Sequence, residues 1–332
     1  MKIKKKILIT GISGFIGSHL SHICKNYDVY GVDIDKNYLK YNSKDLDNST
    51  LLKYLKYRDN KLKGVIKIFN IDTRNQFEIF ELVSKIKPDV IIHLAALPLA
   101  NLSFNLTQET LSSIFNSTYN LLESIRLINR KIKFIYTSSS MVYGNFVNFK
   151  VNEKDKTEPI SIYGCAKLSG EILVKGFAKS FNIRSIIIRP SAVYGPSDTN
   201  KRVVQNFVQS ALTNQKIKIN DKNLILDFTY VEDIAQGFLK AIDYSFLMKK
   251  DYETFNITSS DPKSLEDLFQ EIKYHFPESK CDYLDREKNV PTRGALDISK
   301  AIKLLKYKPR YKFNKGMLKY INIEKKMYEE KN

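Results

Sequence analysis

Two side chains four residues apart, Tyr163 and Lys167, have the types and the spacing for acid–base chemistry. On a helix this spacing puts the phenol and the ammonium on one face. A positive charge beside a phenol stabilises the phenolate and lowers its pKa from about 10, which a general base working near neutral pH requires. The spacing alone is common, and an ordinary surface pair explains it equally well.

A run of hydroxyl residues, Thr137 to Ser140, ends a short apolar stretch about two dozen residues before that pair. In open α/β sheets, ligands bind in the crevice at the carboxyl ends of the strands. If the apolar stretch is such a strand, its hydroxyls and the phenol face the same crevice. We therefore expect the two motifs to share one site.

A glycine-rich segment near the start of the chain, from Thr10 to Gly17, lies between an apolar run and an amphipathic one. Gly11 permits a tight turn, Gly14 lets a pyrophosphate approach the backbone, and Gly17 lets the following helix lie close to the sheet. The next apolar run ends at Asp33, whose carboxylate can accept hydrogen bonds from an adenosine ribose and would repel a 2′-phosphate. No arginine or lysine follows immediately to bind that phosphate, so the pattern predicts a dinucleotide site that prefers NAD to NADP.

The elements that must position these groups alternate between strands and helices through the first 190 residues. Strands joined by helical crossovers form a parallel sheet that is buried on both faces and doubly wound. We expect helices after the glycine-rich turn, before Pro88, and near 107–129 and 162–181. We expect strands at Lys6–Thr10, Asp28–Asp33, Val65–Phe69, Val90–Leu94, Lys133–Ser138 and Ile183–Arg189.

The later part of the chain is less regular. We expect helices near 202–215 and after Ser264, and a strand at Phe255–Ser259 that can return to the first sheet. The polar segment Lys36–Lys63 is interpreted as a surface insertion.

The predicted fold class is therefore α/β: a doubly wound parallel sheet of the Rossmann type with a smaller C-terminal α+β substrate-binding domain. Residues 1–189 would form the NAD-binding domain, with segments near 227–259 returning to it. Residues 190–332 would mainly form the substrate-binding domain.

Composition sets limits on the class of protein. The 332 residues suffice for about two domains, and 43% apolar with 27% charged residues is typical of a globular protein. The net charge is +18, but only 10 of the 54 basic residues are arginine, and lysines are spread along every segment. This distribution argues against a dedicated nucleic-acid site, whereas the generally positive surface favours small anionic substrates such as phosphate esters.

No apolar run is long enough for a membrane span, because the longest, Val90 to Ala100, has about half the required length. Three widely spaced cysteines fit neither a disulfide framework nor a zinc site, so we expect a cytoplasmic protein. His19 and His22 have ligand-like spacing but no carboxylate or cysteine beside them, so no metal is expected.

The chain resembles the extended short-chain dehydrogenases/reductases, in the branch of NAD-dependent nucleotide-sugar epimerases and dehydratases. The resemblance covers nearly the whole chain and rests on several motifs in order. These are Thr10–Leu20 (TGISGFIGSHL), Gly31–Asp33, Asp72, His93–Ala96 (HLAA), Tyr136–Gly144 (YTSSSMVYG), Tyr163–Lys167, Arg189–Pro196 (RPSAVYGP), Asp227–Ala235 (DFTYVEDIA) and Leu296–Pro309.

The resemblance implies roles for the matching residues. Ser139 is the catalytic hydroxyl, Tyr163 is the base, and Lys167 holds the nicotinamide ribose. It also implies a homodimer formed through the helices near 107–129 and 162–181. Asp72 would contact the adenine of NAD. The other expected NAD contacts, besides Tyr163 and Lys167, are Gly11, Gly14, Phe15, Ile16, Gly17, Asp33, Leu94, Ala95 and Ala96.

Two departures from the family pattern concern the implied substrate, a nucleotide-diphospho-sugar. Ala192 and Leu226 stand where many relatives have an asparagine and an arginine that contact the diphosphate. We expect Arg202 and Arg293 to replace them, with Ser139 and Ser140 beside the sugar. The base and the sugar stay open.

The residues that follow Ser139 indicate the reaction. The family's dehydratases have Asp-Glu or a lone Glu there, whereas this chain has Ser140 and Met141, which transfer protons poorly at neutral pH. This favours a nucleotide-sugar 4-epimerase, which oxidises C4 and returns the hydride to the opposite face. A 4,6-dehydratase, a 4-reductase and a catalytically silent NAD-binding sensor are the alternatives. Gly294 aligns with a position that limits room beside the sugar, so N-acetylated sugars should be admitted.

Overall fold

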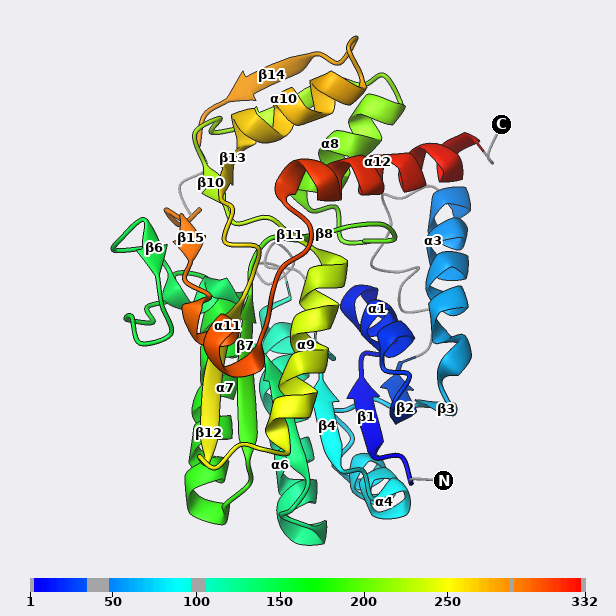
Figure 1. The fold of residues 1–332 in the computed structure, drawn as a ribbon, viewed down its shortest axis with the longest axis vertical. Coiled ribbons are helices and arrows are strands. Elements are labelled where there is room, and N and C mark those ends of the chain that lie inside the picture. Colours follow the sequence, from blue (N-terminus) through cyan, green and yellow to red (C-terminus); the bar gives the residue numbers. More distant parts are fainter. Residues whose placement is uncertain (1–2, 35–47, 97–105, 287–289, 330–332) are drawn as a thin grey trace.

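The computed structural model in Figure 1 describes residues 3–34, 48–96, 106–286 and 290–329. Its centre is a seven-stranded sheet in the order β12-β7-β5-β4-β1-β2-β3, with every neighbouring pair parallel. This order confirms the doubly wound parallel sheet. The strands are β1 (Lys6–Thr10), β2 (Asp28–Asp33), β3 (Lys67–Asn70), β4 (Val90–His93), β5 (Lys133–Thr137), β7 (Ser185–Pro190) and β12 (Tyr252–Ile257).

The predicted strands differ from the observed ones mainly at their ends. β1 and β2 have the predicted bounds, and β3 begins at Lys67, two residues late. The returning strand is also confirmed, although it starts at Tyr252 and pairs with β7 from there.

Helices cover both faces of the sheet (Figure 1). On one face, α1, α9 and α11 pack against Ile7 and Ile9, and on the other, α4, α6 and α7 pack against Leu8 and Phe134. Successive β1 side chains thus enter two different cores, as a strand covered on both faces requires. These elements are α1 (Phe15–Ile23), α3 (Asn48–Lys61), η1 (Leu62–Gly64), α4 (Gln76–Ile86), α5 (Thr107–Leu111), η3 (Ser112–Asn116), α6 (Ser117–Ile128), η4 (Ser140–Tyr143), α7 (Ile162–Phe181), α9 (Val231–Ser245) and α11 (Ser299–Leu305).

A second hydrophobic cluster lies beyond the carboxyl ends of the central strands, in the upper part of Figure 1. Ser264 caps α10 there, as expected, through a reciprocal capping box with Asp267. No helix among the described residues is long and apolar enough to cross a membrane. The elements are α8 (Val203–Leu212), α10 (Leu265–His275), α12 (Phe313–Glu329) and the paired strands β6 (Lys150–Val151) with β15 (Ala295–Leu296), β8 (Val193–Tyr194) with β11 (Thr229–Tyr230), β9 (Ile217–Asn220) with β14 (Cys281–Leu284), and β10 (Ile225–Leu226) with β13 (Lys263–Ser264).

The interpretation of Lys36–Lys63 as a surface insertion is wrong for the second half of that segment. Residues 48–61 form α3, whose Leu51, Tyr54 and Arg58 are buried. These positions repeat at helical spacing, but lysines and asparagines around them conceal the stripe. The first half of the predicted insertion falls largely on residues 35–47, outside the described residues.

Candidate active site

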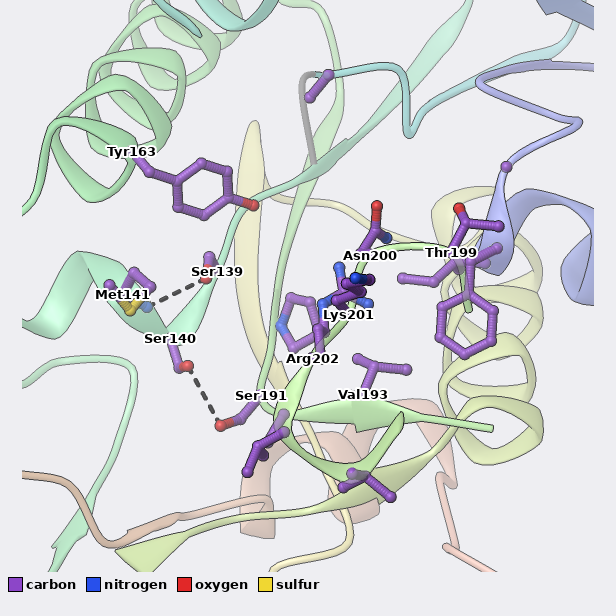
Figure 2. Close-up of a pocket in the computed structure, with 18 of the residues that line it drawn as sticks. Ser139, Ser140, Met141, Tyr163, Ser191, Val193, Thr199, Asn200, Lys201 and Arg202 are labelled. Carbon is purple, nitrogen blue, oxygen red and sulfur yellow. Dashed lines mark hydrogen bonds between the residues drawn. The ribbon is translucent and has the colours of Figure 1, made fainter. Parts of the chain in front are cut away.

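A cavity of about 1080 Å³ lies where the central strands end. All the predicted catalytic, NAD-binding and substrate-binding residues line it, with the exception of Gly294, and Figure 2 shows the part around Tyr163. The strand ends and the first turns of α1 and α7 therefore bring together groups that are far apart in the chain. They are Gly11, Gly14, Phe15, Ile16, Gly17, Asp33, Asp72, Leu94, Ala95, Ala96, Ser139, Ser140, Tyr163, Lys167, Arg202 and Arg293.

The turn before α1 has the shape of an anion cradle. Gly11 has a φ of +70°, and a Cβ there would lie 2.8 Å from the Ala95 nitrogen. A Cβ on Gly17 would collide with the Gly11 carbonyl oxygen. Gly14 precedes the first helical residue, so the unpaired N–H groups of the first turn of α1 face the cavity. These residues fit the pyrophosphate of a dinucleotide.

Asp33 also fits its predicted partner, an adenosine ribose. Its Oδ2 accepts the Ser13 N–H at 2.7 Å, and its Oδ1 accepts the Ile34 N–H at 3.0 Å. Each carboxylate oxygen retains a further lone pair for a ribose hydroxyl. Burial raises the pKa of Asp33, while these two backbone bonds act against that rise.

Asp72, the predicted adenine contact, is held by a neighbour. Arg74 Nε donates to its Oδ2 at 2.8 Å, and the backbone N–H of Arg74 donates to its Oδ1 at 2.9 Å. Burial acts to raise the pKa of Asp72, but the bonds from Arg74 outweigh it and hold the pKa below its usual value. The adenine contact itself stays a prediction.

Tyr163 and Ser139 approach each other from different elements. Ser161 caps α7 by accepting the Gly164 N–H at 3.1 Å, which places Tyr163 in the first helical turn. Ser139 ends the segment after β5 and accepts the Met141 N–H at 3.2 Å. Figure 2 shows the Tyr163 hydroxyl and Ser139 directed into the same space.

The electrostatics of Tyr163 differ from the expectation. We expected Lys167 to lower the pKa of the phenol, but burial raises that pKa, and the groups that oppose the rise are Arg202 and Ser139. Lys167 Nζ instead donates to the Thr137 carbonyl at 2.8 Å, and burial lowers its own pKa to about 7. The prediction that Lys167 lowers the pKa of Tyr163 is therefore wrong for the protein without ligands. The spacing of two residues along a helix does not show how deeply each side chain is buried.

A buried ion pair supports the strand end that carries Ser139. Ser138 donates to Glu171 Oε1 at 2.6 Å, so this hydroxyl is directed toward α7. Arg189 donates to both oxygens of Glu171, at 2.8 and 2.7 Å. Sequence reasoning missed this pair, although Glu171 follows Lys167 on α7 by the same four-residue step.

Arg58 is another site residue that the sequence did not reveal. It is buried on α3 and lines the cavity. Its guanidinium donates to the carbonyls of Ser13 at 3.4 Å and Ser197 at 3.0 Å, and to the Thr199 hydroxyl at 3.2 Å. Burial lowers its pKa to about 10, and the carboxylate of Asp198 is foremost in opposing that shift. One side chain thus joins the glycine-rich turn to the segment before α8.

The two arginines proposed for the diphosphate lie in different surroundings. Arg202 Nη1 pairs with Asp198 Oδ2 at 3.2 Å. Arg293 Nη1 donates to Ser140 Oγ at 3.1 Å, and its Nη2 contacts the Met141 sulfur. Sequence reasoning also missed four other cations that line the cavity, which are Lys201, Lys216, Lys218 and Arg286. Arg286 could have been found, because the chain has only 10 arginines.

Gly294 does not line the cavity. A Cβ there would collide with the carbonyl oxygen of Phe149, whose oxygen also accepts the Ala295 N–H at 2.8 Å. The glycine is thus required for the approach of β6 and β15, and the expectation that it leaves room beside the sugar is wrong.

Two other sequence features lie apart from the chemistry. Burial holds the pKa of His19 well below its usual value, and no group of His, Cys, Asp and Glu in the described part of the chain could hold a metal ion. Cys165 is exposed and is not among the residues that line the cavity.

A glycine-rich turn at a parallel sheet, an acidic residue at the end of the second strand and a tyrosine–lysine pair on one helix define a Rossmann-fold protein of the short-chain dehydrogenase/reductase class. The family model described as GDP-mannose 4,6 dehydratase matches residues 8–320. The chain therefore belongs to this family of nucleotide-sugar epimerases and dehydratases.

Similar proteins carry names of both reactions. An uncharacterized protein of Methanocaldococcus jannaschii is 31% identical over 325 residues, 96% of this chain and 95% of that protein. A dTDP-D-glucose 4,6-dehydratase of Homo sapiens is 28% identical over 326 residues, 96% of this chain and 89% of that protein. A crystal structure of a UDP-glucuronic acid 4-epimerase from Bacillus cereus, with UDP-glucuronic acid and NAD, is 29% identical with a TM-score of 0.84, covering 97% of this chain and all of that one.

Proposed function

We propose that the protein is an NAD-dependent nucleotide-sugar 4-epimerase. The observation that carries this proposal is the set of groups around Ser139. The hydroxyl shares a cavity with Tyr163 and Lys167, but Ser140 and Met141 follow it. A thioether cannot transfer a proton, and a serine hydroxyl without an activating base is a poor group for removing a C5 proton or protonating a departing C6 hydroxyl. The Ser140 oxygen also accepts a hydrogen bond from Arg293, which makes that oxygen a poorer base.

In this reaction the side chains of the protein would remove and return one proton, that of the C4 hydroxyl. The Tyr163 oxygen, with Ser139 as its hydrogen-bonding neighbour, takes the proton of the C4 hydroxyl and returns it after the keto-sugar has turned its other face. NAD, when bound, supplies the acceptor and then the donor of the hydride. Atoms balance over the cycle, since both proton and hydride return to the sugar with inverted C4.

Arg202 has a second task in this proposal. It is among the groups that act to lower the pKa of the buried Tyr163 phenol, which favours the phenolate that proton removal needs. Asp198 anchors the guanidinium in place at 3.2 Å.

The preference for NAD over NADP rests on Asp33. Its carboxylate lies on the cavity wall, where a 2′-phosphate would meet a like charge. Gly11, Gly14 and Gly17 would hold the pyrophosphate at the start of α1.

We also propose that the protein is a homodimer. The helical segments from Thr107 to Phe181 expose large apolar side chains that a partner helix pair would cover: Leu111, Phe115, Tyr119 and Ile172. Light scattering of the purified protein tests the mass, and a monomer at micromolar concentration would contradict this assembly.

Proton NMR of reaction mixtures tests the function. The protein, with NAD, is incubated with UDP-, GDP- and dTDP-linked sugars. We expect inversion at C4, no net NADH, and no deuterium at C5 when the reaction is run in heavy water. A 4-keto-6-deoxy product would establish a dehydratase instead, and stoichiometric use of added NADH would establish a reductase.

A further inference from the structure

The guanidinium of Arg293 contacts the two residues that follow Ser139, the catalytic serine of the proposed reaction. Its Nη1 is 3.1 Å from the Ser140 oxygen, and Ser140 is the residue after Ser139. Ser140 Oγ in turn lies 3.2 Å from Ser191 Oγ, as the dashed line in Figure 2 shows. Both serines are buried, at 2% and 4% exposure, so the cation and two hydroxyls form one polar group in the cavity wall.

Arg293 differs from the other arginines of the cavity in its charge balance. No ion pair joins it to any carboxylate of the described residues, and burial, with no acidic group acting against it, lowers its pKa to about 10. A partly buried cation without an anionic partner is energetically costly in the protein alone, and binding of an anionic ligand offsets that cost. The others face acids: Arg74 with Asp72, Arg202 with Asp198, Arg286 with Asp221, and Arg58 beside Asp198 and Asp33.

The position of the guanidinium selects among the anions of a nucleotide-sugar. Ser139 and Tyr163 must contact the C4 oxygen, and C1, which carries the diphosphate, is opposite C4 across the pyranose ring. C6 is the exocyclic carbon on C5, and C5 is bonded to C4. A group at C6 therefore lies near the C4 end of the sugar and away from the diphosphate. The diphosphate has other cations available on the cavity wall, at and beside β9 and after β14: Lys216, Lys218 and Arg286.

We propose that Arg293, supported by Ser140 and Ser191, forms a carboxylate subsite for C6 of the sugar, so that the enzyme prefers nucleotide-linked uronates. This role replaces the diphosphate contact expected of Arg293 from the sequence. This inference rests on the proposed function, because that function places C4 at Ser139. A planar guanidinium suits a carboxylate, which it can bind through two parallel hydrogen bonds.

Binding of two probes that differ only at C6 tests the subsite. UDP-glucuronate and UDP-glucose share their nucleotide and diphosphate, and their affinities for the NAD-loaded protein are measured by calorimetry. We expect the wild type to bind UDP-glucuronate at least about tenfold more tightly. Arg293→Gln should remove that preference and change the affinity for UDP-glucose less than about threefold, while Arg293→Lys should keep part of it.

A matched control separates the carboxylate from the diphosphate. Arg286→Gln removes a cavity cation near β14 and should weaken both ligands by the same factor. Equal losses for both ligands in Arg293→Gln, or no preference in the wild type, would overturn the subsite.

Turnover separates this inference from the proposed function. Selective binding of UDP-glucuronate with no inversion of either sugar would leave the subsite and refute the epimerase. Inversion of UDP-glucose without any preference for UDP-glucuronate would support the epimerase and refute the subsite.

Discussion

Removing the cation of the buried Arg189–Glu171 pair should destabilise the protein strongly. The two side chains are 2% and 0% exposed and share two short hydrogen bonds, so Arg189→Met leaves a carboxylate buried without its main partner. Breaking such a pair costs about 3–5 kcal/mol. With an unfolding entropy of about 2 cal/mol/K for each of the 332 residues, this predicts a Tm lower by about 4–7 °C at pH 7, measured by calorimetry.

The pH dependence of this loss has a definite sign. Burial acts to raise the pKa of Glu171, but the bonds from Arg189 and Ser138 outweigh it and hold that pKa below its usual value. The pair therefore stabilises the fold above the unfolded carboxyl pKa of about 4.3, and this stabilisation is lost as the pH falls through the folded pKa. The Tm difference between wild type and variant should narrow below about pH 4.

An exposed pair provides the control. Lys156 Nζ lies 2.5 Å from Glu158 Oε1, and the two side chains are 69% and 67% exposed, so Lys156→Met removes the cation of a pair that solvent surrounds. Exposed ion pairs contribute little to stability, so the Tm should barely change. Equal shifts for the two variants, or a Tm difference for Arg189→Met that is constant from pH 7 to pH 3, would refute the reasoning.

Three further predictions concern the cavity. Tyr163→Phe should lower turnover by roughly two or more orders of magnitude, the scale of a general base, with NAD binding retained; more than about a tenth of the activity would exclude Tyr163 as the base. Asp33→Ala should weaken NAD more than NADP in fluorescence titrations, and tighter binding of NADP by the wild type would contradict the role given to Asp33. Because Arg202 acts to lower the pKa of Tyr163, Arg202→Gln should raise it and move the rising limb of the pH–kcat profile to higher pH; an unmoved limb would remove Arg202 from this role.

Local pattern was sufficient for most of the fold. β1 was predicted with its observed bounds because a strand buried on both faces is a continuous apolar run, which the glycine-rich turn ends here. The helix α7 was found for a similar reason, since Ser161 and Phe181 bound a long amphipathic stretch. The helix α3 was missed because its buried stripe lies within a lysine-rich segment, and its burial depends on distant residues.

The motif residues of the site were predictable, but Arg58, the other missed cations and the charge relations of the site were not. Motif order placed Ser139, Tyr163 and Lys167 in one cavity. The direction of the Tyr163 pKa and the isolation of Arg293 depend on which carboxylates the fold brings near each cation, and spacing along the chain does not contain that information.

The bonds of Arg58 have a consequence for the lifetime of the loaded enzyme. Its guanidinium fastens the Ser13 carbonyl, on the dinucleotide side of the cavity, to Ser197 and Thr199, on the side that leads to α8. Separating these two walls would break the hydrogen bonds of a buried cation. Breaking buried charged contacts costs several kcal/mol, so any release of a dinucleotide that requires this separation is slowed. We therefore expect the dinucleotide to stay bound through many turnovers. Slow release of the dinucleotide is compatible with the proposed epimerase reaction, because that reaction regenerates NAD in each turnover.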